Sequence, residues 1–182
     1  MESTDPMFHV VLHEPEIPNN TGNIGRTCIA TGCSLHLIRP LGFDTGEKAC
    51  RRAGLDYWPR LRPTEHDDWG TFLRSGAADA DRLWFFTTKT DRPLWDARFE
   101  SGDALVFGKE TEGLPGWILE QHPDRLLTLP MVPGERSLNL ATAVCAAVYE
   151  GLRQLGGDGR LVVRCGRLHA PGAMVERTEE KP

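Results

Sequence analysis

The stretch EPEIPNNTGNIGRT, from Glu14 to Thr27, decides how the rest of the chain is interpreted. It follows a short apolar run and contains two prolines, three asparagines, two glycines and a single arginine, Arg26. Proline fixes the backbone, and glycine permits backbone conformations that other residues avoid. So many backbone-shaping residues before one cation indicate a tight loop that leads from a strand into a helix and fixes where Arg26 lies.

The helix after this loop is predicted over residues 21–31, with Asn20 or Thr21 as its N-terminal cap. Its apolar face follows a helical period and comprises Ile24, Thr27, Cys28 and Thr31. At about 100° per residue, Arg26 lies roughly opposite Ile24 and points away from the core. Arg26 is therefore either a solvated surface arginine or a functional side chain presented to a ligand.

The remaining elements alternate between strands and helices. Strands are predicted at residues 8–13, 34–40, 82–88, 103–108 and 125–130, and further helices at residues 66–75, 115–121 and 137–155. Continuous apolar strands interleaved with helices are typical of an α/β fold with a mostly parallel sheet and helices on both faces. We expect one domain over residues 7–156, a disordered leader at residues 1–6, and a partly disordered extension at residues 157–182.

The composition narrows the functional classes. The chain has 182 residues and a net charge of −5, which argues against a nonspecific nucleic-acid binder. Residues 44–62 and 159–173 are nevertheless locally basic, which suits either contacts to one defined RNA or merely solvated faces. The sequence contains no run of about 18 apolar residues and no secretory leader, so we expect a cytoplasmic protein that does not bind a membrane.

The cysteines predict no metal site. They number five and show neither paired CxxC spacing nor zinc-like spacing with histidine. Their positions are Cys28, Cys33, Cys50, Cys145 and Cys165. We expect them to be reduced, small apolar side chains.

Two further loops follow strands in an unusual way. GKETEGLPG begins at Gly108, directly after the strand that ends at Phe107, and PMVPGERS begins at Pro130, directly after Leu129. In a parallel sheet, ligands bind where strands end and loops lead to helices. Each loop alone is also ordinary turn chemistry. The dinucleotide fingerprint GxGxxG and the phosphate loop GxxxxGK[ST] are absent, so neither NAD nor ATP is indicated.

Taken together, these loops resemble those of a known family. The segments that carry the resemblance are EPEIPNNTGNIGR (14–26), RRAGLDYW (51–58), FFTTK (85–89), LVFGKETEGLP (105–115) and LPMVPGERSLNLATAVCAAVYEGLRQL (129–155). They are similar to the SPOUT class of RNA methyltransferases, and within it to the tRNA 2′-O-methyltransferases that modify a wobble cytidine or uridine of leucine tRNAs. The resemblance covers about Met7 to Gly156.

The resemblance implies a C-terminal trefoil knot, formed by the loops after Gly108 and Leu129 with the last helix, that holds S-adenosylmethionine. The implied cofactor-binding residues are Phe86, Thr87, Gly108, Leu129, Met131 and Ser137. The implied catalytic residues are Arg26, Glu110, Ser137 and Asn139. A guanidinium stays protonated in proteins, so we expect Arg26 to hold an RNA phosphate and polarise the ribose oxygen, while its role as a base stays open. Ser137 is equally suited to capping the last helix alone.

The last predicted helix suggests a homodimer. Its apolar residues face two sides, with Leu140, Val144, Val148 and Leu152 on one side and Ala141, Cys145 and Tyr149 on the other. The resemblance implies a dimer whose active site uses both chains, although a helix buried wholly within the monomer would show the same pattern. Two functional alternatives stay open, namely a ribosomal RNA 2′-O-methyltransferase and a noncatalytic RNA-binding module on the same fold.

Overall fold

The computed structural model describes residues 6–45 and 58–171. Its first half contains β1 (His9–His13), α1 (Pro18–Thr31), β2 (Ser34–Ile38), α3 (Trp58–Leu61), β3 (Thr64–His66) and α4 (Trp69–Arg74). Its second half contains η1 (Ala80–Arg82), β4 (Leu83–Phe86), η2 (Leu94–Asp96), β5 (Ala104–Phe107), α5 (Gly116–Gln121), η3 (Pro123–Arg125), β6 (Leu126–Leu127), α6 (Leu140–Gly157), β7 (Val162–Arg164) and β8 (Arg167–His169). Residues 1–5 of the predicted leader and most of the RRAGLDYW segment lie outside the described residues.

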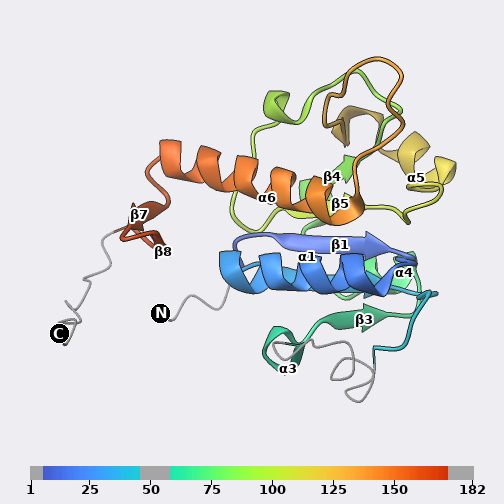
Figure 1. The fold of residues 1–182 in the computed structure, drawn as a ribbon, viewed down its shortest axis with the longest axis horizontal. Coiled ribbons are helices and arrows are strands. Elements are labelled where there is room, and N and C mark those ends of the chain that lie inside the picture. Colours follow the sequence, from blue (N-terminus) through green and yellow to red (C-terminus); the bar gives the residue numbers. More distant parts are fainter. Residues whose placement is uncertain (1–5, 46–57, 172–182) are drawn as a thin grey trace.

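One six-stranded sheet runs through the molecule, in the order β3-β2-β1-β5-β4-β6 (Figure 1). Each neighbouring pair is parallel, and Val11 of β1 lies between His36 of β2 and Val106 of β5. The predicted α/β class with a mostly parallel sheet is confirmed. Strand β3, at the sheet edge, was not predicted.

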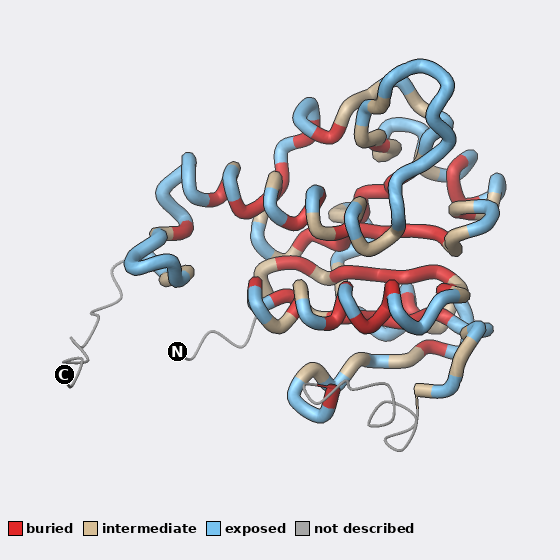
Figure 2. The backbone as a smooth tube through the Cα atoms, in the orientation of Figure 1, coloured by how far each residue is buried: buried red, intermediate tan, exposed pale blue. Residues whose placement is uncertain are grey.

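Helices cover both faces of the sheet, whose central strands are buried along most of their length (Figure 2). Each face has its own apolar core. On one face α1 and α6 lie side by side, and Ile24 and Val148 pack with Leu105 of β5. On the other face α4 and α5 supply Phe72 and Ile118. Alternate residues of every central strand therefore point into different cores, which explains why these strands are apolar throughout.

Three predicted helix starts differ from the structure by three residues. Helix α4 begins at Trp69 instead of residue 66, because His66 belongs to β3 and Asp68 caps the helix. Helix α1 begins at Pro18, with Ile17 in the cap position, so Asn20 lies inside the first turn and caps nothing. Proline suits the first helical turn because its backbone nitrogen needs no acceptor there. Helix α6 begins at Leu140, and its cap is Asn139, whose side chain accepts hydrogen bonds from the backbone N–H of two residues in the first turn. Ser137 therefore lies outside the helix and does not cap it.

Three histidines form a hydrogen-bonded row across β1, β2 and β3. His36 Nε2 lies 3.1 Å from His9 Nδ1, and His36 Nδ1 lies 3.1 Å from His66 Nε2. The Ser34 hydroxyl bridges His9 and His36. Burial, together with the two neighbouring imidazoles, lowers the pKa of His36 from 6.5 to about 3. His36 is consequently neutral at physiological pH.

The extension after α6 contains an element that was not predicted. Strands β7 and β8 pair antiparallel as a hairpin, with Arg164 opposite Arg167 at the turn. In the part of the chain that the structure describes, no helix is long and apolar enough to cross a membrane. The same residues contain no group of three His, Cys, Asp or Glu side chains placed to hold a metal ion.

Candidate active site

A cavity of about 400 Å³ opens at the carboxyl edge of the sheet. It is lined by the ends of β4 and β5, by the loops after β5 and β6, and by the first turns of α1 and α6. Strands β1 and β5 are neighbours in the sheet. Strands β2 and β3 lie on one side of this pair, and β4 and β6 lie on the other, so the sheet changes its direction of growth between β1 and β5. Such switch points are where open α/β sheets bind ligands.

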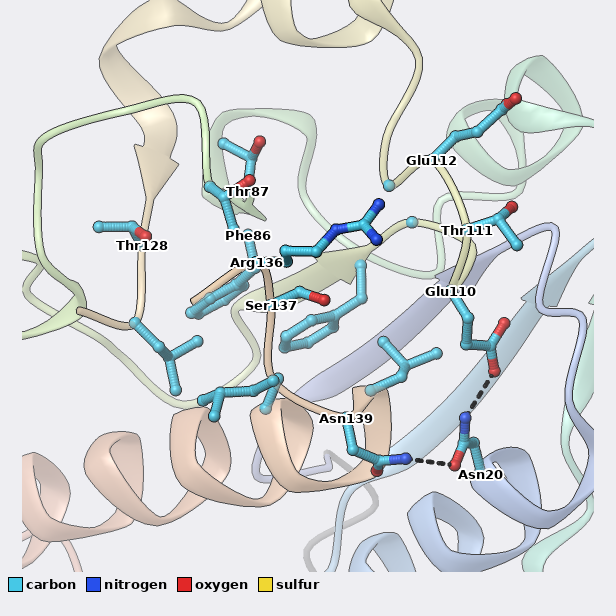
Figure 3. A pocket seen from close by; sticks show the side chains of 18 of the residues that line it. Asn20, Phe86, Thr87, Glu110, Thr111, Glu112, Thr128, Arg136, Ser137 and Asn139 are labelled. Atoms are coloured by element: carbon cyan, nitrogen blue, oxygen red, sulfur yellow. Dashed lines mark hydrogen bonds between the residues drawn. The ribbon is translucent and has the colours of Figure 1, made fainter. Parts of the chain in front are cut away.

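Every predicted cofactor residue lines this cavity. They are Phe86, Thr87, Gly108, Leu129, Met131 and Ser137, and the predicted catalytic residues Glu110 and Asn139 line it as well. Phe86 and Phe107 stack with ring centroids 4.5 Å apart and give the cavity an apolar floor. Figure 3 shows polar groups around this floor, among them Thr87, Ser137 and Arg136.

The lead-in to α1 is held by the loop after β5. The Glu110 carboxylate accepts hydrogen bonds from the backbone N–H of Glu16 at 2.8 Å and of Ile17 at 3.3 Å, and from Asn20 Nδ2 at 2.9 Å. In return, the Glu16 carboxylate accepts bonds from the backbone N–H and the hydroxyl of Thr111, both at 3.1 Å. We call residues 14–17 and 108–114 together the fixed wall.

Gly108 shows how tightly the fixed wall is closed. A Cβ added there would lie 2.0 Å from the carbonyl carbon of Gly113 and 2.1 Å from the nitrogen of Leu114. Gly108 therefore leaves room for the backbone of Gly113 and Leu114, which occupies the space where a side chain would begin. Gly108 shapes the cavity by letting the loop fold back on itself, and Gly113 completes the turn with a φ of +73°.

Asn20 joins the fixed wall to α6. Asn139 Nδ2 donates to Asn20 Oδ1 at 2.9 Å, while the Asn139 side-chain oxygen caps α6 (Figure 3). The chain of bonds from Asn139 through Asn20 to Glu110 thus ties the starts of two helices to the end of β5. Glu110 and Asn139 therefore use their side chains to hold the starts of α1 and α6 in place beside the cavity.

The opposite side of the cavity is built differently. Every residue from Val132 to Asn139 is exposed, and the loop holds a single backbone turn bond, from Glu135 N–H to Val132 carbonyl at 3.3 Å. We call residues 130–138 the open wall. Ser137 and Arg136 belong to it and face the cavity (Figure 3).

Arg136, Lys89 and Asn20 line the cavity but were not singled out as site residues from the sequence. Arg136 directly precedes Ser137, and Lys89 closes the FFTTK segment, so both belong to the segments that carry the family resemblance. The sequence alone did not show that these two side chains lie beside the cavity. They give it two cations that can attract a polyanion.

The fixed wall also contains a lysine paired with two carboxylates. Lys109 Nζ lies 2.9 Å from a carboxylate oxygen of Glu112 and 3.7 Å from one of Glu14. The hydrogen bond to Glu112 raises the pKa of Lys109. Burial lowers the pKa of His13, at the end of β1, despite the nearby Glu14 carboxylate. Lys109 is therefore charged and His13 neutral near pH 7.

Arg26 does not line the cavity of its own chain. It is exposed on α1, while Ile24 is buried, as the helical period predicted. It follows Asn20 by six residues, which corresponds to about 9 Å along the helix axis. The structure thus separates Arg26 from the other predicted catalytic residues.

Comparison with known proteins identifies the class. Residues 7–149 match the SpoU rRNA Methylase family, and the chain belongs to that family.

Among individual proteins, the chain is 49% identical over 154 residues to a tRNA (cytidine(34)-2′-O)-methyltransferase of Saccharophagus degradans, covering 84% of this chain and 99% of the relative. A solved structure concerned with 2′-hydroxyl methylation of C/U34 on tRNA is 46% identical, with a TM-score of 0.75, and the match covers 84% of this chain and 98% of that one. A SpoU methyltransferase from Streptomyces viridochromogenes in complex with the cofactor AdoMet shares the fold, with 24% identity and a TM-score of 0.69 over 84% of this chain and 59% of that one.

Proposed function

We propose that this protein transfers a methyl group from S-adenosylmethionine to the ribose 2′-hydroxyl of the wobble nucleotide, C or U at position 34, of a tRNA. The observation that carries the proposal is the cavity at the carboxyl edge, lined by every residue expected to bind the cofactor. Leucine tRNAs are the substrates we expect. Because tRNA is the substrate, the cytoplasm is the proposed site of action.

The residues present fit S-adenosylmethionine. A volume of about 400 Å³ lies within the range of small-molecule sites. The apolar floor of Phe86 and Phe107 suits an adenine ring, and the exposed backbone of the open wall offers hydrogen bonds. When bound, the cofactor supplies a methyl group activated by its sulfonium. We further propose that the loops after Gly108 and Leu129 form a trefoil knot with α6.

The protein's own residues then have to align the ribose oxygen with the methyl group and stabilise the negative charge that develops on this oxygen as the hydroxyl proton leaves to an RNA phosphate or to water. Alignment alone can supply a large part of a rate enhancement. We assign Arg26 to holding an RNA phosphate and polarising the 2′-hydroxyl, and Ser137 to orienting the methionine end of the cofactor. Glu110 and Asn139 act by positioning, through the bonds that fix α1 and α6.

A homodimer would bring Arg26 to a cavity. The outward side of α6 carries Tyr149, with 56% of its surface exposed, and the half-buried Cys145, while Val144 and Val148 pack into the core. Helix α1, which carries Arg26, lies beside α6. We propose that a second copy covers this side, so that Arg26 of each subunit serves the cavity of its partner.

The test is single-turnover transfer of a labelled methyl group to a leucine tRNA transcript, with bulk ribosomal RNA as a second substrate. Arg26→Ala should lower the rate by about 10² to 10³ while cofactor binding stays intact, and Arg26→Lys should restore little because a point charge lacks the planar fork of guanidinium. Arg74→Ala, which changes an exposed arginine at the end of α4, is the matched control. Near-normal transfer by Arg26→Ala, or transfer to ribosomal RNA alone, would contradict the assignment.

The shared site has a separate test. Thr87→Trp should fill the cavity and abolish transfer. If Arg26 serves the partner's cavity, mixing the inactive Arg26→Ala and Thr87→Trp proteins should restore activity, because each mixed dimer contains one complete site. A mixture that stays inactive after subunit exchange, confirmed by mass measurement of the mixed dimer, would show that the site lies within one chain.

A further inference from the structure

The hairpin of β7 and β8 lies beyond the family region, which ends at residue 149. It is nevertheless fixed to the domain. Leu161, which precedes β7, is only 4% exposed, and Leu168 of β8 packs against the core that contains α6. The backbone N–H of Arg160 also donates to the Leu155 carbonyl at 2.9 Å. The hairpin is therefore held in a defined position at the end of α6.

The exposed side of this hairpin is positively charged. Arg160, Arg164 and Arg167 are all exposed, and the sequence contains no acidic residue from Gly159 to Pro171. Within the ranges 6–45 and 58–171, none of these three arginines forms an ion pair. In the antiparallel pair of β7 and β8, Arg164 lies opposite Arg167, so the two strands carry neighbouring guanidinium groups.

This concentration of charge contrasts with the chain as a whole, whose net charge is −5. Guanidinium groups bind phosphate through planar, paired hydrogen bonds, and RNA presents a regular row of phosphates. An acidic protein that acts on tRNA needs local positive surfaces to hold it. Charge complementarity therefore favours an RNA backbone as the occupant of the hairpin's exposed side.

The hairpin lies at the opposite end of α6 from the cavity (Figure 1). The helix has 18 residues, a length of about 27 Å. A nucleotide bound in the same chain's cavity is thus out of reach of the hairpin. Any RNA that contacts both must extend over that distance, as the body of a tRNA does beyond its anticodon loop.

We propose that the β7–β8 hairpin is an RNA-binding arm that holds phosphates of the tRNA body away from the nucleotide to be methylated. This proposal rests on the proposed tRNA substrate. The arm contributes to affinity through Arg160, Arg164 and Arg167 and takes no part in the transfer itself. It would supplement the contacts that a tRNA makes at the cavity.

The experiment compares tRNA binding by the full-length wild type and the double variant Arg164→Gln/Arg167→Gln, using fluorescence anisotropy of a labelled tRNA transcript across a salt series. Loss of two phosphate contacts should weaken binding roughly tenfold at low salt and reduce the slope of log affinity against log salt by about 1.5. Arg74→Gln, on α4, serves as the control for loss of an exposed arginine and should leave the slope nearly unchanged. Arg164→Lys/Arg167→Lys should retain most of the affinity.

Two further measurements distinguish an RNA-binding arm from a hairpin that only supports the fold or the dimer. The KM for tRNA should rise in the double glutamine variant while kcat and cofactor affinity stay at wild-type values, and an isolated anticodon stem-loop should bind both proteins equally. An unchanged salt slope, or an equal loss on the stem-loop, would overturn the proposal, as would a weakened dimer in light scattering with unchanged tRNA affinity. Because anisotropy requires no catalysis, binding by the arm can be established even if methyl transfer to this tRNA fails.

Discussion

The loop that leads into α1 and the loop that leads into α6 border the same cavity but are held by different means. In the fixed wall, the Glu110 carboxylate accepts three hydrogen bonds, and the Glu16 carboxylate accepts two from Thr111 in the loop after β5. In the open wall, the residues from Val132 to Leu138 are exposed and hold one backbone turn bond among themselves. The polar groups of the fixed wall are bonded to each other, whereas those of the open wall can form hydrogen bonds with a ligand.

The difference separates two kinds of functional residue. Glu110 and Asn20 satisfy the polar groups at the start of α1, so changes there should act first on stability. Ser137 and Arg136 have no comparable structural role, so changes there should act first on ligand binding. Buried or constrained polar groups are expensive to leave unpaired, while exposed loop residues contribute little to folding.

The largest effect on stability is expected in the fixed wall at Gly108. Gly108→Val would place side-chain atoms where the Gly113 and Leu114 backbone already lies, so the loop must open. We expect a loss of roughly 4 kcal/mol in the free energy of unfolding, or no folded protein. Gly134→Ala, in the open wall, meets no atom within 4 Å and should cost only about 1 kcal/mol for its positive φ. Equal losses in urea unfolding would erase the distinction between the two walls.

Acid should weaken the sheet at the row of three histidines. The pKa of His36 is about 3 in the folded protein, where burial is the main cause, and 6.5 otherwise. Between these values the unfolded chain binds one more proton, so this stability is present above pH 6.5 and is lost as the pH falls towards 3, by about 1.4 kcal/mol per pH unit. His36→Asn should flatten that slope by one proton. Urea unfolding from pH 7.5 to 4.5 measures it, and an unchanged slope would show that His36 is protonated when folded.

A smaller loss is expected where the two loops of the fixed wall are joined. Glu110→Ala removes the acceptor for the N–H groups of Glu16 and Ile17 and for Asn20. We expect about 2 kcal/mol of destabilisation, with faster amide exchange at the start of α1. Thr111→Val should lose less, because the Thr111 backbone bond to Glu16 stays. Stability unchanged by Glu110→Ala, with methyl transfer abolished, would return Glu110 to a directly catalytic role.

The sequence predicted where the site lies better than how its fixed wall is held. The loops that follow the apolar strands place Gly108 and Leu129 at one edge of a parallel sheet, and the family resemblance adds Phe86. All three residues line the cavity at that edge. The start of α1 was missed because Asn20 bonds to Glu110 and Asn139, which lie 90 and 119 residues further along the chain. Local propensity favours asparagine as a cap and contains no information about such partners.

The hairpin was missed for a different reason. Its strands, VVR and RLH, have three residues each, and the glycines and arginines around them are also typical of a loop. What fixes it is the packing of Leu161 and Leu168 against the core beside α6, a tertiary contact. Local strand propensity is weak in such short segments, and burial decides the outcome.

The smallest effect on stability is expected at Ser137, in the open wall. Ser137 is exposed and lies before the cap of α6, so Ser137→Ala should change the free energy of unfolding by less than about 0.5 kcal/mol. Asn139→Ala, two residues on, should cost about 1 kcal/mol because it removes the cap. If Ser137 orients the cofactor, Ser137→Ala should weaken S-adenosylmethionine binding in calorimetry by roughly tenfold, the loss of one good hydrogen bond. A variant that loses stability but binds the cofactor normally would make Ser137 part of the framework, and the two walls would then differ only in exposure.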